Sequence, residues 1–95
     1  MKRPFISGIA ALDTYLAEGF DKVPGMSSRF SATICGHLMR RQTEIGIRGS
    51  VAEIGAFEGR FLIAMGHALA AGEHAYGFDV FTWPDDRVLD RFVAN

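Results

Sequence analysis

The chain has 95 residues, of which 48% are hydrophobic and 22% charged, and its formal net charge is −1. This length limits it to one small domain, and the near-neutral charge gives no argument for binding nucleic acid or an anionic membrane surface. No stretch reaches the roughly 20 apolar residues that a membrane-spanning helix needs, so we expect no membrane partner and a cytoplasmic location. Cys35 is the single cysteine, which excludes an intrachain disulfide and fits a reducing compartment.

Residues 1–48 predict a helical segment with two amphipathic helices. The first is expected over about residues 7–17, and the Pro24 and Gly25 pair after it marks a turn. Either Ser27 or Ser28 is suited to cap the second helix, which should end by Gly46. The apolar positions, which predict the buried faces, are Ile9, Leu12, Tyr15 and Leu16 in the first helix and Phe30, Ile34, Leu38 and Met39 in the second.

Residues 50–95 predict a strand, a helix, a second strand and a last helix. The run 51–54 is too apolar for a strand with one solvated face, apart from Glu53. A helix is expected over 59–71, with Gly72 as a left-handed cap, and a second strand over 75–79. Because a helix separates them, the two strands should be parallel. Pro84 should open the last helix, with a buried stripe formed by Val88, Leu89, Phe92 and Val93.

The turn after the first strand carries two glycines, Gly55 and Gly59, and an acid, Asp79, ends the second strand. A glycine turn between a strand and a helix is a common place for small ligands, and an acid on the next strand suits a ribose. The dinucleotide fingerprint G-x-G-x-x-G fails here, because Phe57 and Arg60 occupy its second and third glycine positions. What remains is the pattern E-x-G-x-x-x-G from Glu53 to Gly59.

These residues resemble the first motif of class I S-adenosylmethionine-dependent methyltransferases, in their small-molecule O-methyltransferase branch. The segment EIGAFEG matches that motif, in which an aromatic residue replaces the middle glycine, and Asp79 matches the acid of the second strand. Pro84 and Asp85 resemble the start of the helix that follows. The resemblance covers about a third of the chain well. It implies a Rossmann-like three-layer α/β methyltransferase fold, here reduced to N-terminal helices and a β-α-β-α unit.

The resemblance also implies roles for eight residues in binding S-adenosylmethionine. Asp79 would accept hydrogen bonds from the ribose diol, and the backbone at Gly55 and Ala56 would lie against the methionine part. Glu53 would hold that loop or the ammonium of the ligand. The remaining implied contacts are Phe57 and Gly59 in the turn and Val80 and Phe81 at the start of the adenine pocket. Trp83 is a further candidate for adenine stacking.

Each of these residues also has a purely structural interpretation. A glycine turn is often only a turn, Asp79 is suited to cap a loop, Glu53 to pair with an arginine, and Phe57 and Trp83 to pack. The three histidines lack metal-ligand spacing, so we expect no metal site. The sequence therefore leaves three hypotheses for the function of the chain: a methyltransferase portion, a non-catalytic interaction module that pairs with another chain, and a fragment of a nicotinamide-dependent oxidoreductase.

The sequence offers no candidate for a catalytic residue. In the enzymes that the motif resembles, the catalytic base, the pocket for the small-molecule acceptor and any metal ligands come from later strands. We therefore expect a truncated methyltransferase, in which residues 50–95 form part of the S-adenosylmethionine-binding domain. Strands with open edges invite pairing with other chains, so self-association is also expected.

Overall fold

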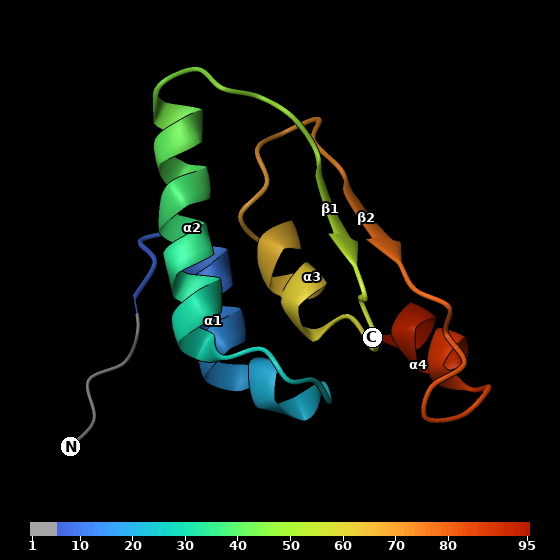
Figure 1. Cartoon of the computed structure of the whole chain (residues 1–95). Helices are drawn as coiled ribbons and strands as arrows, with labels where there is room; N and C mark the ends of the chain where they lie inside the picture. Colours follow the sequence, from blue (N-terminus) through green and yellow to red (C-terminus); the bar gives the residue numbers. More distant parts are fainter. Residues whose placement is uncertain (1–5) are drawn as a thin grey trace.

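The computed structural model describes residues 6–95 (Figure 1). In this part of the chain two helices come first, followed by the two strands of a small parallel sheet, each of which is followed by a helix. The elements are α1 (Ala10–Glu18), a single 3-10 turn η1 (Phe20–Lys22), α2 (Arg29–Glu44), β1 (Val51–Ile54), α3 (Arg60–Gly66), β2 (Ala75–Phe78) and α4 (Val88–Ala94). The predicted α/β class and the β-α-β-α order are confirmed. None of the helices in this part of the chain is long and apolar enough to cross a membrane.

The predicted buried face of α1 is confirmed. Leu12 and Leu16 lie in the core, and Ile9 and Tyr15 pack against them. The helix ends at Glu18, and Gly19 is its C-cap. Isolated helices as short as this nine-residue one are marginal in water. Burial of a leucine side chain contributes roughly 2 kcal/mol, so this buried stripe stabilises α1.

The buried face of α2 differs from the expected one. Of the two predicted candidates, Ser27 and Ser28, it is Ser28 that caps the helix, since its hydroxyl accepts a hydrogen bond from the Ser31 amide at 3.1 Å. The core, however, is met by the small residues Ala32, Thr33 and Gly36, of which Gly36 lies so close to α1 that an added Cβ would stand 2.4 Å from Leu12 Cδ2. Close approach of two helices favours small side chains. Of the expected apolar stripe only Met39 packs against the core, and Phe30, Ile34 and Leu38 are exposed.

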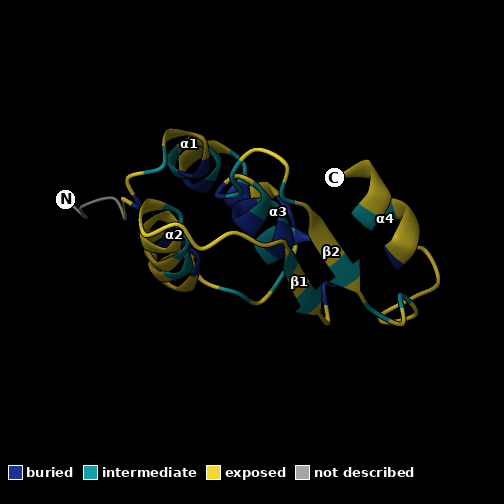
Figure 2. Cartoon of the chain, turned by 90° about the horizontal axis from the view of Figure 1, so that it is seen from above, coloured by how far each residue is buried: buried dark blue, intermediate teal, exposed yellow. Residues whose placement is uncertain are grey.

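The two strands pair in parallel, as predicted, with Val51 opposite Ala75 and Ile54 opposite Phe78. Helix α3 lies between the sheet and the α1–α2 pair, and it covers only one face of the sheet (Figure 2). The other face carries Ala52, Ile54, Tyr76 and Phe78, all exposed, with Ile54 at 90%. The expectation that β1 is buried on both faces is therefore wrong, because no described element packs against this side.

Two helix boundaries also differ from the prediction. Helix α3 ends at Gly66 rather than near residue 71, because the next residues form i to i+3 bonds and Glu73 accepts a hydrogen bond from the Ala70 amide at 2.6 Å. Helix α4 begins at Val88, after a turn that contains a cis peptide bond before Pro84. Val88 is buried and Phe92 half-buried, but Leu89 and Val93 are exposed, so half of the expected stripe is wrong.

Candidate functional site

The turn after β1 and the loop after β2 meet at the carboxyl end of the sheet. Gly55 donates its amide to the Phe78 carbonyl at 2.7 Å, so the strand pairing continues one residue into the turn. Gly55 has φ = 81° and Gly59 has φ = 93°, in the left-handed region that glycine adopts without strain. The two glycines singled out in the sequence therefore serve the backbone of this turn.

Asp79 ties the two loops together. One carboxylate oxygen accepts the amide of Phe57 at 2.9 Å, and the other accepts the amide of Phe81 at 2.9 Å. The hydrogen bond from Phe81, followed by that from Phe57, holds the pKa of Asp79 below its ordinary value, so the side chain is an anion at neutral pH. A carboxylate offers about four acceptor positions. After these two bonds, each oxygen retains an acceptor position for a ligand hydroxyl.

Both amides that bind Asp79 belong to residues in a strained conformation. Phe57 has φ = 52° and Phe81 has φ = 55°, and they are the only described non-glycine residues with positive φ. Each such residue costs on the order of 1 kcal/mol. Charge-assisted hydrogen bonds to Asp79 offset this cost. Strain of this kind concentrates at ligand sites, so the pair makes this end of the sheet the candidate site.

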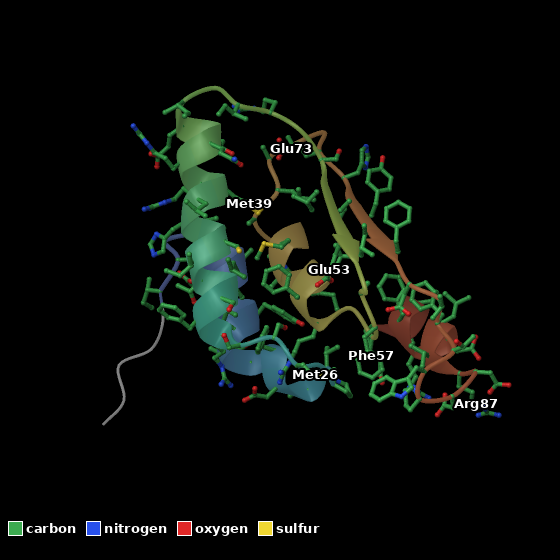
Figure 3. All side chains as sticks on the ribbon, viewed as in Figure 1. Met26, Met39, Glu53, Phe57, Glu73 and Arg87 are labelled. Atoms are coloured by element: carbon green, nitrogen blue, oxygen red, sulfur yellow. The ribbon has the colours of Figure 1, made fainter. Side chains whose placement is uncertain are left out.

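Glu53 lies on the face of β1 that is turned toward α3 (Figure 3). Its Oε1 atom is buried, and within the described part of the chain it has no hydrogen-bond partner. Burial, and then the nearby charge of Asp79, raises the pKa of Glu53 above its ordinary value. The sequence left open an arginine partner for this carboxylate, and no ion pair to it is observed among residues 6–95. A buried acceptor without a donor is costly, and a cationic ligand group would satisfy it.

A pocket of about 140 Å³ lies beside Glu53. Its walls are residues 55–57 of the turn, residues 24–27 of the loop before α2, and the side chains of Arg60 and Phe61. In Figure 3, Met26 and Phe57 both lie at the end of the molecule to which the strands point. Pockets for whole ligands usually measure 300 Å³ or more, so this one is sized for one end of a ligand whose remainder lies over the strand ends.

Aromatic side chains surround the loop after β2. The Phe57 and Trp83 rings lie 5.8 Å apart between centroids, and the Phe81 and Phe92 rings lie 5.2 Å apart. Val80 is exposed beside them. Val80 and Phe81, for which the resemblance implies adenine contacts, therefore have apolar and aromatic surface around them.

Four of the eight predicted site residues, Glu53, Gly55, Ala56 and Phe57, line this pocket. Asp79, Val80 and Phe81 lie in the loop after β2. Gly59 lies elsewhere, directly before α3. It is buried beneath α4, where an added Cβ would stand 3.2 Å from the Phe92 ring. It lines a separate, larger hollow of about 340 Å³ between α3 and Phe92, whose walls are mostly apolar. Its role in the structure is to let α4 pack against the turn.

Two residues of the site were not singled out from the sequence. Glu58 is buried at 6% exposure and pairs with Arg91 of α4 at 3.0 Å, which fixes that helix against the turn. Arg60 binds the loop before α2. Both carry a weak signal in the sequence. Glu58 stands between the two glycines of the turn, and Arg60 is a cation at the positive end of a helix, where a positive charge is unfavourable without another partner.

No family model, curated protein or solved structure matches this chain. Within residues 6–95, no three His, Cys, Asp or Glu side chains are grouped as a metal site would require. The chemistry of the site therefore has to be argued from its own geometry.

Proposed function

We propose that the carboxyl end of the sheet binds S-adenosylmethionine, and that the chain is the cofactor-binding portion of a class I methyltransferase that acts on a small molecule. The observation that carries the proposal is the buried, unpaired oxygen of Glu53 in a pocket wall, next to the loop that Asp79 organises. S-adenosylmethionine presents an ammonium group at one end and a ribose diol near the other. The carboxylate of Glu53 is suited to bind the ammonium group, and that of Asp79 is suited to bind the diol.

Each part of the cofactor would contact a different set of residues. Glu53 would accept the ammonium, and the backbone of residues 55–57 would lie against the methionine part. Asp79, with its remaining acceptor positions, would bind the two ribose hydroxyls. Val80 and Phe81 would contact the adenine, with Trp83 close by. The bound cofactor supplies the methyl group, while the chain's own contribution is to bind and orient it.

The arrangement of the strands supports the same proposal. Ligands of open parallel α/β sheets bind outside the carboxyl ends of the strands, and Glu53, Gly55 and Asp79 all lie there. A two-stranded parallel unit with one helix between the strands is compatible with the first part of a Rossmann-like sheet. The three-layer methyltransferase fold itself is part of the proposal.

Calorimetric titration with S-adenosylhomocysteine tests the proposal, because this product keeps the amino acid, ribose and adenine groups. We expect saturable binding to the wild-type chain. A parallel titration with reduced nicotinamide cofactor should give no binding, since two glycines of its fingerprint are missing. Binding of the nicotinamide cofactor alone would favour the oxidoreductase reading instead.

A non-catalytic interaction module is the second candidate, and the uncovered face of the sheet favours it. Ile54, Tyr76 and Phe78 form an exposed apolar surface there, and each strand has a single neighbour among the described elements. Surfaces and edges of this kind pair with other chains, a second copy included. Sedimentation should then show a dimer that Ile54→Thr with Phe78→Thr converts to monomer. A wild-type monomer over the whole concentration range would contradict this candidate.

A further inference from the structure

Arg60 begins α3, yet its side chain serves another part of the chain. A cation at the first position of a helix meets the positive end of the helix dipole. The side chain is only 17% exposed. It must therefore gain enough from its partners to offset both the dipole and the lost hydration.

Those partners lie in residues 20–27, between α1 and α2. The guanidinium Nε donates to the Phe20 carbonyl at 3.0 Å, and Nη1 donates to the carbonyls of Gly25 at 3.0 Å and Ser27 at 2.9 Å. Nη2 contacts an Asp21 carboxylate oxygen at 3.3 Å. The guanidinium carbon also lies 4.4 Å from the centroid of the buried Phe20 ring, in cation–π contact.

The loop that Arg60 holds is a wall of the pocket beside Glu53. Residues 24–27 and the turn residues 55–57 line that pocket together, although they lie about thirty positions apart in the sequence. Gly25 fits closely around the arginine, because an added Cβ there would stand 2.9 Å from Arg60 Cβ. Without the arginine, no other described side chain donates to the Gly25 and Ser27 carbonyls.

We infer that Arg60 is a positioning residue that fixes the loop of residues 24–27 as a wall of the pocket, and so makes the site select ligands with an amino acid end. This inference rests on the proposed function. Three charge-assisted hydrogen bonds to carbonyls order the loop before a ligand arrives. When the loop is already ordered, binding does not bear the cost of ordering it.

The affinities of two ligands that share the adenosine group distinguish a positioning role of Arg60 from a general loss of structure. S-adenosylhomocysteine carries the amino acid end, whereas 5′-methylthioadenosine lacks it. In Arg60→Gln we expect about tenfold weaker binding of S-adenosylhomocysteine, equivalent to the loss of one charge-assisted hydrogen bond. Binding of 5′-methylthioadenosine should change less than about twofold, because its contacts lie at Asp79 and Phe81 rather than at the loop.

Three variants complete the experiment, with thermal unfolding recorded for each. Gly25→Ala should reproduce the selective loss, because its Cβ displaces the same loop while Arg60 stays. Arg60→Lys should recover little, since an ammonium cannot reproduce the planar fork of a guanidinium. Arg91→Gln is the matched control, an arginine that ties α4 to the turn, and it should leave the ratio of the two affinities unchanged.

The outcomes are distinct. Equal weakening of both ligands in Arg60→Gln and Gly25→Ala, or no weakening of either, would overturn the positioning role. A wild-type chain that binds 5′-methylthioadenosine as tightly as S-adenosylhomocysteine would overturn it as well. Failure of the wild-type chain to bind either ligand would instead overturn the proposed function on which the inference rests.

Discussion

Each end of the sheet contains a carboxylate that accepts hydrogen bonds from the backbone amides of two loops. At the amino end, Glu73 accepts the amides of Gly49 at 2.7 Å and Ala70 at 2.6 Å. At the carboxyl end, Asp79 accepts those of Phe57 and Phe81, both at 2.9 Å. Glu73 and Phe57 mark the two ends in Figure 3. A carboxylate that ties two loops is therefore not by itself a sign of a ligand site.

What separates the two ends is what surrounds each carboxylate. At the carboxyl end, both donors to Asp79 are phenylalanines with positive φ, and a second carboxylate, Glu53, has a buried oxygen without a partner. At the amino end, no described non-glycine residue has positive φ. Strain and an unsatisfied acceptor cost stability, and strained residues of this kind cluster at active sites and ligand sites. The amino end is consequently a matched control for the carboxyl end.

The largest expected difference between the two ends is in ligand affinity. Asp79→Ala should weaken binding of S-adenosylhomocysteine by on the order of 100-fold, because two charge-assisted hydrogen bonds to the diol are lost. Glu73→Ala should change it by less than about threefold, although it breaks an equivalent pair of bonds. Calorimetric titration of both variants makes the comparison. Similar losses in the two would mean that Asp79 acts only by holding its loops.

A smaller effect is expected from Glu53→Gln. The glutamine keeps the shape of the side chain but removes the charge that attracts an ammonium, so affinity for S-adenosylhomocysteine should fall about tenfold. Thermal stability should stay the same or rise, because a buried charge without a partner is removed. A fall in the melting temperature without any change in affinity would show that the carboxylate serves the fold.

As the pH falls, ligand binding and the folded state should be lost at different pH values, because different carboxylates control them. Burial raises the pKa of Glu53 above 4.5, so Glu53 takes up its proton first and binding weakens while the chain stays folded. Protonated Glu53 no longer opposes folding. Backbone hydrogen bonds lower the pKa of Asp79 below 3.8 and that of Glu73 below 4.5. Their stabilising contribution is present above those ordinary values and is lost as pH falls through the lowered ones.

Calorimetric titrations at several pH values, with circular dichroism at each, check this order. The midpoint for loss of binding should lie at a higher pH than the midpoint for acid unfolding. In Glu53→Gln the upper midpoint should disappear while the lower one remains. Coincident midpoints in the wild-type chain would contradict the assignment of Glu53 to the ligand.

The smallest effect compares two glycines, one at each end. Gly55 and Gly72 have φ = 81° and φ = 83°, and an added Cβ would meet no atom within 4 Å at either position. Replacement by alanine should therefore cost about 1 kcal/mol at both, through backbone conformation alone. Chemical denaturation measures this cost. Only Gly55→Ala should also weaken ligand binding, because Gly55 lines the pocket and Gly72 does not.

Most of the carboxyl-end site was predictable because its residues are close in sequence or follow from strand order. The positions of Gly55 and Phe57 follow from the pattern between Glu53 and Gly59. Asp79 reaches them because parallel strands end at the same edge of a sheet. The position of Gly59 beneath α4 was not predictable in this way, since its neighbour in space is Phe92, which lies 33 positions later. The wall formed by residues 24–27 was not foreseen for the same reason.

The sequence by itself determined the local features: the helix and strand order, a serine cap at Ser27 or Ser28, the buried face of α1, and the turn between β1 and α3. These depend on periodicity, on capping groups and on glycine, all of which act within a few residues. Only the tertiary structure decided which face of α2 meets the core, where α3 ends, which side of the sheet is covered, and that Arg60 joins two distant loops into one pocket. Such contacts depend on side-chain size and on donors and acceptors far apart in the chain, which no local pattern records.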